Sequence, residues 1–322
     1  MLPRALRKNT PQSITTALVY AIPFVVMATV GNSETQQWSS KSILTPYFEP
    51  ITSVHWLNTT IGTALLLFTA GYTQHVFNKY RLFKSANQFP FILTLALLTC
   101  SSNVGVVSPW ICGSLLVIRL LDRALDIQRA NKANMIILEA SFTAGILWVF
   151  SSEYIWAFPI VFLAYLYSGS VQIKGFVMSI VGFLLPSYFF ISLNYLFDHP
   201  RGLSELELVV PKFDFIDTPQ YTLLIGCLIV VIIGFRYFLK SIVVNKIIIK
   251  NHLVLVIVLS AMWVFSSAFS ANSISDLVAG SFLGFSLLAG LYFANATKTW
   301  LMEATFYVWY LCVVAFLYLT IS

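Results

Sequence analysis

Residues 220–236 read QYTLLIGCLIVVIIGFR, and residues 252–270 read HLVLVIVLSAMWVFSSAFS. The first stretch has no charged residue before Arg236, and the second has no Asp, Glu, Lys or Arg at all. A helix needs about 20 mainly apolar residues to cross the hydrocarbon core of a bilayer. The two stretches therefore predict membrane-spanning helices, joined on one side of the membrane by a short basic loop.

The composition of the whole chain agrees with this prediction. Of its 322 residues, 58% are hydrophobic and only 10% are charged, whereas a soluble domain has about 25% charged residues. The mean hydropathy is +0.81. These values exclude a soluble enzyme, a disordered tail and a nucleic-acid-binding domain. We therefore expect an all-α polytopic helix bundle that forms a single integral membrane domain over residues 1–322.

Apolar stretches recur along the chain and predict eleven spans. Several are at the lower limit of length, and the pair around Ser101-Ser102-Asn103 could instead be a re-entrant hairpin, so nine or ten spans are the alternative. The predicted spans are 15–31, 56–76, 88–104, 108–122, 135–150, 155–170, 175–196, 220–236, 252–270, 276–296 and 299–320.

The charges predict an orientation. Lys and Arg are retained on the cytoplasmic side of a membrane protein, and sixteen of the nineteen fall on one side if the spans alternate. That side holds the N-terminus, while the other side holds nine of the thirteen acids. We therefore expect a cytoplasmic N-terminus. The three exceptions are Lys41, Arg201 and Lys212.

Two outer loops are long enough to carry a function. Residues 32–55 mix aromatic and polar residues, as an interfacial segment does, and residues 197–219 are acidic. On the inner side, the basic loops 119–134 and 236–251 are expected to contact anionic lipid headgroups. The basic start and apolar core of residues 1–31 also resemble a secretory signal, for which an uncleaved signal anchor is the favoured interpretation.

Two acids fall inside predicted spans. Glu139 lies in MIILEASF and Glu303 in WLMEATF, and a charge in hydrocarbon costs about 2.5–3.5 kcal/mol on insertion scales. Such acids can serve a transporter. Both lie about one turn from the cytoplasmic boundary, however, so the favoured interpretation is that they reach headgroups or a base such as Lys132 or Lys298.

The polar residues of the second outer loop form a candidate ligand site. Asp198, His199 and Arg201 surround Pro200 and could hold an anionic headgroup or a phosphate, although a solvated turn around Pro200 and Gly202 is the favoured interpretation. The four histidines are divided between the two sides, with His75 and His252 expected at the inner interface. The four cysteines lie in apolar stretches, so we expect no metal and no cofactor.

Two further patterns concern helix packing. Gly280 and Gly284 form a GxxxG motif, which is typical of close helix contacts and could present a face to another membrane protein. The sequence WVFSS occurs at 148–152 and again at 263–267. A parallel internal repeat is one interpretation, and a chance match between apolar segments is the other.

Several segments together resemble an uncharacterised multi-pass inner-membrane family of Bacteroidota, some members of which are labelled carotene monooxygenases. That label implies four histidines around an iron on a soluble propeller, which this helical chain cannot build. The family supplies no functional residues. The segments are Ser108-Pro109-Trp110, Arg119–Arg123, Ala144–Ile146 with 148–152, 276–284, Leu291–Asn295 and Trp300–Glu303.

A looser resemblance is to polyprenol-dependent glycosyltransferases of the C type. In that family the first outer loop carries a catalytic acid, and the loop after the seventh span contacts the lipid-phosphate donor. The resemblance implies Glu34 (or Glu49) as general base, with Asp198, His199 and Arg201 at the phosphate. The chain departs from the family in having Ser-Glu-Thr where many members have two adjacent acids.

Three functions remain open from the sequence. The favoured one is a non-catalytic subunit or partner in an envelope assembly or secretion complex. The alternatives are a C-type glycosyltransferase-like protein acting on polyprenol-linked sugars at the outer face, and a transporter or flippase. The partners expected in every case are the lipid bilayer and its anionic lipids, with no nucleic acid.

Overall fold

The computed structural model describes residues 2–7, 10–30, 54–101, 105–129, 134–150, 152–168, 172–196, 218–270 and 274–321. Within these ranges the regular structure is entirely helical and contains no strand, as the sequence predicts. In chain order the helices are α1 (Leu2–Ala5), α2 (Pro11–Val30), α4 (His55–Lys79), α5 (Phe89–Leu98), α6 (Pro109–Ile127), α7 (Asn134–Phe150), the 3-10 helix η1 (Ser152–Trp156), α8 (Ala157–Tyr167), α9 (Ile173–Leu196), α10 (Thr218–Val244), α11 (Ile247–Ser270), α12 (Ile274–Gly280), α13 (Phe282–Asn295) and α14 (Thr299–Ile321).

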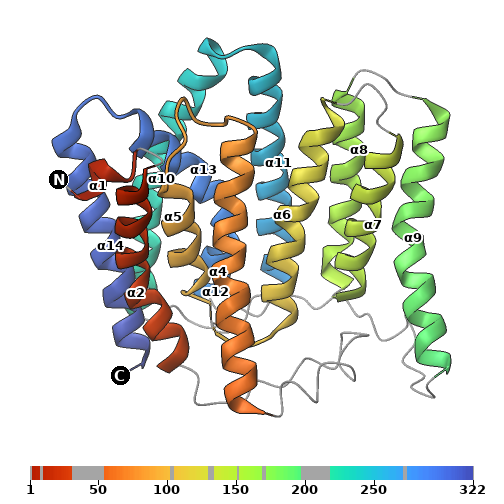
Figure 1. Ribbon diagram of the computed structural model, residues 1–322, viewed down its shortest axis with the longest axis horizontal. Coiled ribbons are helices and arrows are strands. Elements are labelled where there is room, and N and C mark those ends of the chain that lie inside the picture. The colour runs from red at the N-terminus through yellow and green to blue at the C-terminus, as the bar shows by residue number, and fades with distance from the viewer. Residues whose placement is uncertain are drawn as a thin grey trace.

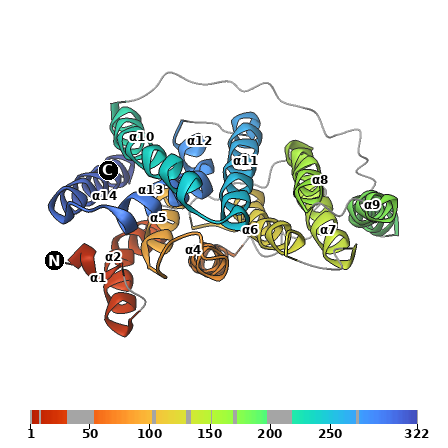
Figure 2. The same ribbon diagram turned by 90° about the horizontal axis from the view of Figure 1, so that it is seen from above.

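The long helices stand side by side and alternate in direction along the chain (Figure 1). Seen from above, α7, α8 and α9 lie at one side of the bundle and α2 and α14 at the other, with α5 and α13 between them (Figure 2). Each predicted span overlaps one of these helices, or the pair α12 and α13. The alternating pattern of apolar stretches was therefore sufficient to locate the helices.

One end of the bundle gathers basic residues. The Arg7 guanidinium donates to the Ala296 carbonyl at 2.8 Å, and the Gln88 amide donates to the Leu6 carbonyl at 2.9 Å. The end of α4 meets the end of α6 through Lys79 and Asp126, at 3.2 Å. We call this the basic end. The opposite end, where α2 and α9 finish and α4 and α10 begin, is called the far end (Figure 1).

Fewer of the described helices are long and apolar enough to cross a membrane than the eleven spans predicted. Among the described residues, five helices qualify, namely α2, α9, α10, α11 and α14, and the pair α12 and α13 makes a sixth although it bends by 62°. Helices α5, α7 and α8 are shorter than a span, and α6 carries Arg119, Asp122, Arg123 and Asp126. These helices would need neighbours to cover their polar groups or to make up their length.

The ten-residue helix α5 departs most from its predicted span. It covers about 15 Å, half the thickness of the hydrocarbon core, where the sequence predicted a span over 88–104. The chain beyond it is irregular but buried, since Ser101, Val106, Val107 and Ser108 are each less than a tenth exposed. Irregular backbone is tolerated at membrane depth only when protein covers it, which is the case for these residues.

Residues 148–150 of the first WVFSS segment end α7, and the second segment lies in α11, which runs in the same direction, but the surroundings of the two differ. Trp148 stacks on Phe183 of α9 at 5.2 Å, whereas Trp263 stacks on Tyr154 of η1 at 4.8 Å. Helix α9 packs closely on α7, while its counterpart α14 packs mainly on α10. The helix packing therefore favours a chance match over a repeated unit.

Candidate functional site

The outer-loop candidates Glu34, Asp198, His199 and Arg201 lie outside the described residues, and so does Glu49. The two acids within predicted spans are described. Both lie at the basic end and are paired with arginines rather than with the lysines named from the sequence. These pairs agree with the interpretation that the acids serve charge compensation.

Glu303 and Glu139 each tie two helices together. Glu303 Oε1 lies 2.8 Å from Arg4 Nε, which joins the start of α14 to α1. Glu139 Oε2 lies 3.1 Å from Arg123 Nε, which joins α7 to α6. Arg4 comes from the opposite end of the chain and Arg123 from the preceding helix, and the sequence alone did not indicate either pairing.

The GxxxG face is used within the chain. A methyl group on Gly280 would come within 2.4 Å of Ser267 Oγ, and one on Gly284 within 3.1 Å of the Ser260 Cβ. Both serines belong to α11. These glycines therefore pack against α11 within the chain, and a contact of this face with another membrane protein stays a prediction.

At the far end, the break between α12 and α13 lies beside the irregular segment that follows α5. Asp276, in the first turn of α12, is 5% exposed and accepts a hydrogen bond from Ser101 Oγ at 3.0 Å. The neighbouring Asn58 of α4 is also buried and its side-chain oxygen accepts from the Val107 amide at 2.8 Å. By the predicted spans Asp276 is one of the nine acids on the outer side, and the structure buries it against Ser101.

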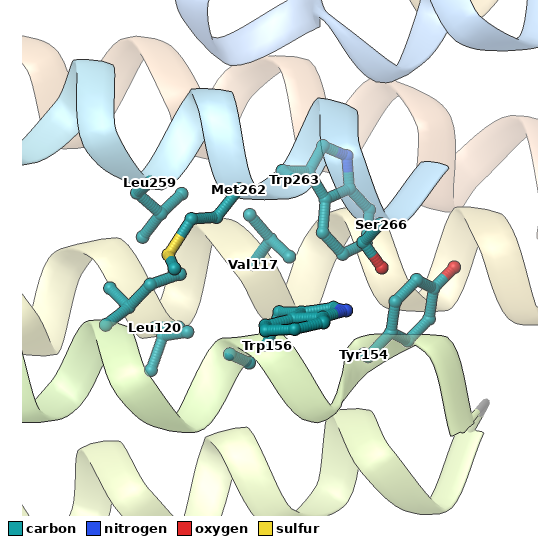
Figure 3. Close-up of a pocket in the computed structure, with 10 residues that line it drawn as sticks. Val117, Leu120, Tyr154, Trp156, Leu259, Met262, Trp263 and Ser266 are labelled. Atoms are coloured by element: carbon teal, nitrogen blue, oxygen red, sulfur yellow. The ribbon is translucent and has the colours of Figure 1, made fainter. Parts of the chain in front are cut away.

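A small apolar pocket lies between α6, η1, α8 and α11 (Figure 3). In Figure 3 the side chains of Met262 and Trp263 from α11 face Tyr154 and Trp156 from η1. Trp156 also meets Phe265 edge-on at 5.4 Å, and both rings are more than a third exposed. The remaining lining residues are Val117, Leu120, Ala157, Ile160, Leu259 and Ser266.

The packing of α11 on α12 connects the pocket with the helix that carries Asp276. Trp263 and Ser266 line the pocket, while the adjacent Ser267 packs against Gly280 of α12, four residues after Asp276. The second WVFSS segment therefore has an apolar contact on one side and a polar neighbourhood on the other. We call Asp276, Ser101, Ser267 and the pocket the far-end site.

The basic end holds a second polar cluster, which the sequence did not indicate. Asp122 of α6 is buried and accepts hydrogen bonds from Lys79 Nζ at 2.8 Å, from the Tyr80 hydroxyl at 2.9 Å and from the Tyr72 hydroxyl at 3.0 Å. Arg119 lies 3.6 Å from the same carboxylate. Burial, followed by the carboxylates of Asp126 and Asp122, raises the pKa of Tyr80 above its ordinary value, so its hydroxyl stays a donor.

His252, in the second turn of α11, is covered by this cluster. The sequence predicts an interfacial histidine, but its side chain is 0% exposed and meets the Tyr80 ring edge-on at 5.5 Å. Neither of its ring nitrogens has a hydrogen-bond partner. A buried polar group without a partner costs about 1–3 kcal/mol, so this position is one of the least satisfied in the described chain.

Metal binding finds no support in the described ranges, where no three His, Cys, Asp or Glu side chains come close enough to hold an ion. No family model, characterised protein or solved structure is significantly similar to the chain. Both family resemblances therefore remain predictions from the sequence. The far-end site and the polar cluster around Asp122 are the structural features that bear on function.

Proposed function

We propose that this chain is a multi-pass protein of a bacterial inner membrane that acts on a polyprenol-linked sugar at its far end. The orientation follows from the charge bias, because the basic end would face the cytoplasm and the far end the outside. Loops 31–53 and 197–217, which carry Glu34, His199 and Arg201, join helices that end or begin at the far end (Figure 1).

The single observation that carries this proposal is the composition of the far-end site. A lipid-linked sugar is an amphiphile. The site has a buried carboxylate, Asp276, in the first turn of α12, and the end of that helix packs on α11 beside residues that line an apolar aromatic pocket. A carboxylate accepts hydrogen bonds from sugar hydroxyls, and the pocket suits hydrocarbon. Glu34 would act as general base, with Arg201 and His199 at the phosphate.

The proposal is tested by the profile of lipid-linked sugars in cells that lack the chain and are complemented with variants. Asp276→Asn keeps the shape of the side chain and removes its charge, and we expect it to lower the modified lipid about tenfold to a hundredfold, the cost of one charge-assisted hydrogen bond. Glu34→Gln and Arg201→Ala are expected to act in the same direction.

Asp126→Asn, which alters an acid at the basic end, serves as the matched control and is expected to leave the profile unchanged. All variants must reach the membrane in the amount of the wild type. An unchanged profile for Asp276→Asn and Glu34→Gln would contradict the proposal.

A non-catalytic subunit of an envelope complex is the second candidate. It is favoured by the ion pairs of Glu139, Glu303 and Asp122, which use these acids to hold helices together. The same pairs remove the support for a transporter working through Glu139 or Glu303. Purification in mild detergent distinguishes the subunit: a stoichiometric partner supports it, and a lone monomer with full complementing activity opposes it.

A further inference from the structure

The end of α6 and the start of α11 contain buried polar atoms that nothing in the described chain satisfies. Both ring nitrogens of His252 lack a hydrogen-bond partner among the described residues. The same holds for the side-chain oxygen and nitrogen of Gln128, the C-cap residue that follows α6. More than nine in ten buried polar groups in proteins are hydrogen-bonded. Gln128 directly precedes Arg129, whose guanidinium lies over the same Tyr80 ring that His252 contacts, so these two residues point to a polar ligand or ordered water at this corner of the bundle.

A cation without a carboxylate partner lies next to them. The Arg129 guanidinium is exposed and sits 4.6 Å from the centre of the Tyr80 ring, and among the described residues no acid pairs with it. His252 contacts the edge of the same ring. Tyr80 thus holds an exposed arginine and a buried histidine against one aromatic side chain.

The nearby acids are already compensated. Asp122 is paired with Lys79 and Arg119, and Asp126 with Lys79 and Arg123. Arg129 is therefore the base next to Tyr80 whose positive charge is not paired with an acid among the described residues. An anion would meet a free guanidinium, and the nearby acids would repel it less because bases already neutralise them.

We propose that Arg129, His252 and Gln128 bind a phosphate group. Arg129 would supply a charge-assisted hydrogen bond, and the other two side chains would donate one N–H each. His252 is five residues inside α11, about 8 Å along the helix from Ile247, which is within reach of the headgroup layer. The phosphate can come from an anionic lipid or from solution, and both present the same chemistry.

The test uses the full chain in nanodiscs and measures the midpoint of thermal unfolding. Phosphatidylcholine discs are compared with discs that also contain phosphatidylglycerol, and with phosphatidylcholine discs in millimolar inorganic phosphate. A bound anion at about a hundredfold excess over its Kd would raise the midpoint by about 5 °C. Phosphatidylglycerol as the effective addition identifies a lipid headgroup, and inorganic phosphate identifies a soluble anion.

Three variants separate a built site from general attraction to a charged surface. Arg129→Gln and His252→Phe are expected to lose the shift, and His252→Phe, which keeps the aromatic contact with Tyr80, should also be at least as stable as the wild type in phosphatidylcholine. Lys240→Gln removes the same charge from an exposed site on α10 and should keep the shift. Equal losses for Arg129→Gln and Lys240→Gln, a full shift in His252→Phe, or no shift in the wild type would overturn the proposal. The readout is stability, so it is independent of the proposed enzymatic function.

Discussion

Asp122 organises the basic end at the scale of single residues. Its carboxylate is 7% exposed and accepts from side chains of α4 and of the turn that follows α4, while Arg119 of its own helix lies 3.6 Å away. Burying a carboxylate is costly unless it is paired and hydrogen-bonded, and Asp122 meets both conditions. The arrangement fixes the turn after Lys79, where Arg81 adopts a φ of 53°, a conformation uncommon for a residue with a side chain.

We predict that Asp122→Asn destabilises the protein by about 2–3 kcal/mol. The substitution removes the charge that Lys79 and Arg119 face and weakens the hydrogen bonds from Tyr72 and Tyr80. The midpoint of thermal unfolding in mild detergent measures the effect. Asp126→Asn is the matched control, because Asp126 is 22% exposed and shares Lys79, and it should cost about 1 kcal/mol or less. Equal effects of the two substitutions would contradict the central role of Asp122.

Residues of this kind define the limit of what the sequence could predict about the sites. Lys79 and Tyr80 lie more than 40 positions before Asp122, so their convergence depends on how α4 packs against α6. His252 follows Lys246, Lys250 and Asn251 and for that reason resembles an interfacial residue, but Tyr80 from a distant turn covers it. The apolar environment of Glu139 and Glu303 was evident, whereas their arginine partners were not.

At the scale of elements, the irregular segment after α5 packs closely on the backbone of α4, where the sequence predicted a continuing helix. Gly62 packs against the irregular segment after α5, and a methyl group there would come within 2.5 Å of the Gly105 carbonyl oxygen. Gly105 itself has a φ of 71°, which glycine adopts without strain. The apolar run 88–104 predicted a longer helix, because nothing local indicates that Asn58 and Gly62 will hold the chain in an irregular conformation.

We predict opposite effects for two alanine substitutions in α4. Gly62→Ala is expected to destabilise the protein by about 1–3 kcal/mol, since the methyl group meets backbone atoms that cannot move independently. Gly71→Ala places its methyl group where no atom lies within 4 Å and should stabilise the helix by about 0.5–1 kcal/mol. Thermal unfolding of both variants measures the difference. A stabilised Gly62→Ala variant would show that α4 does not approach Gly105 closely.

At the scale of the whole molecule, the sorting of charges predicted more than any motif. Among the described residues, the apolar stretches located every α-helix except the short α1, because 3.6-residue periodicity is unnecessary when both lipid and core are apolar. They predicted more full-length spans than the described helices provide, because α5, α7 and α8 are apolar but shorter than a membrane span. The charges of the described chain lie mainly at one end of the bundle, in agreement with the alternation of basic and acidic segments.

The proposed function requires an orientation in which the far-end site and both long loops face the outer side of the membrane. Cysteine labelling in intact cells with a membrane-impermeant thiol reagent tests it directly, in a background where the four native cysteines are replaced by serine. We predict that Ser33→Cys and Ser204→Cys are labelled in intact cells, while Lys84→Cys and Lys246→Cys, exposed at the basic end, are labelled only after permeabilisation. Labelling of Lys84→Cys in intact cells together with protection of Ser33→Cys would contradict this orientation and the function proposed from it.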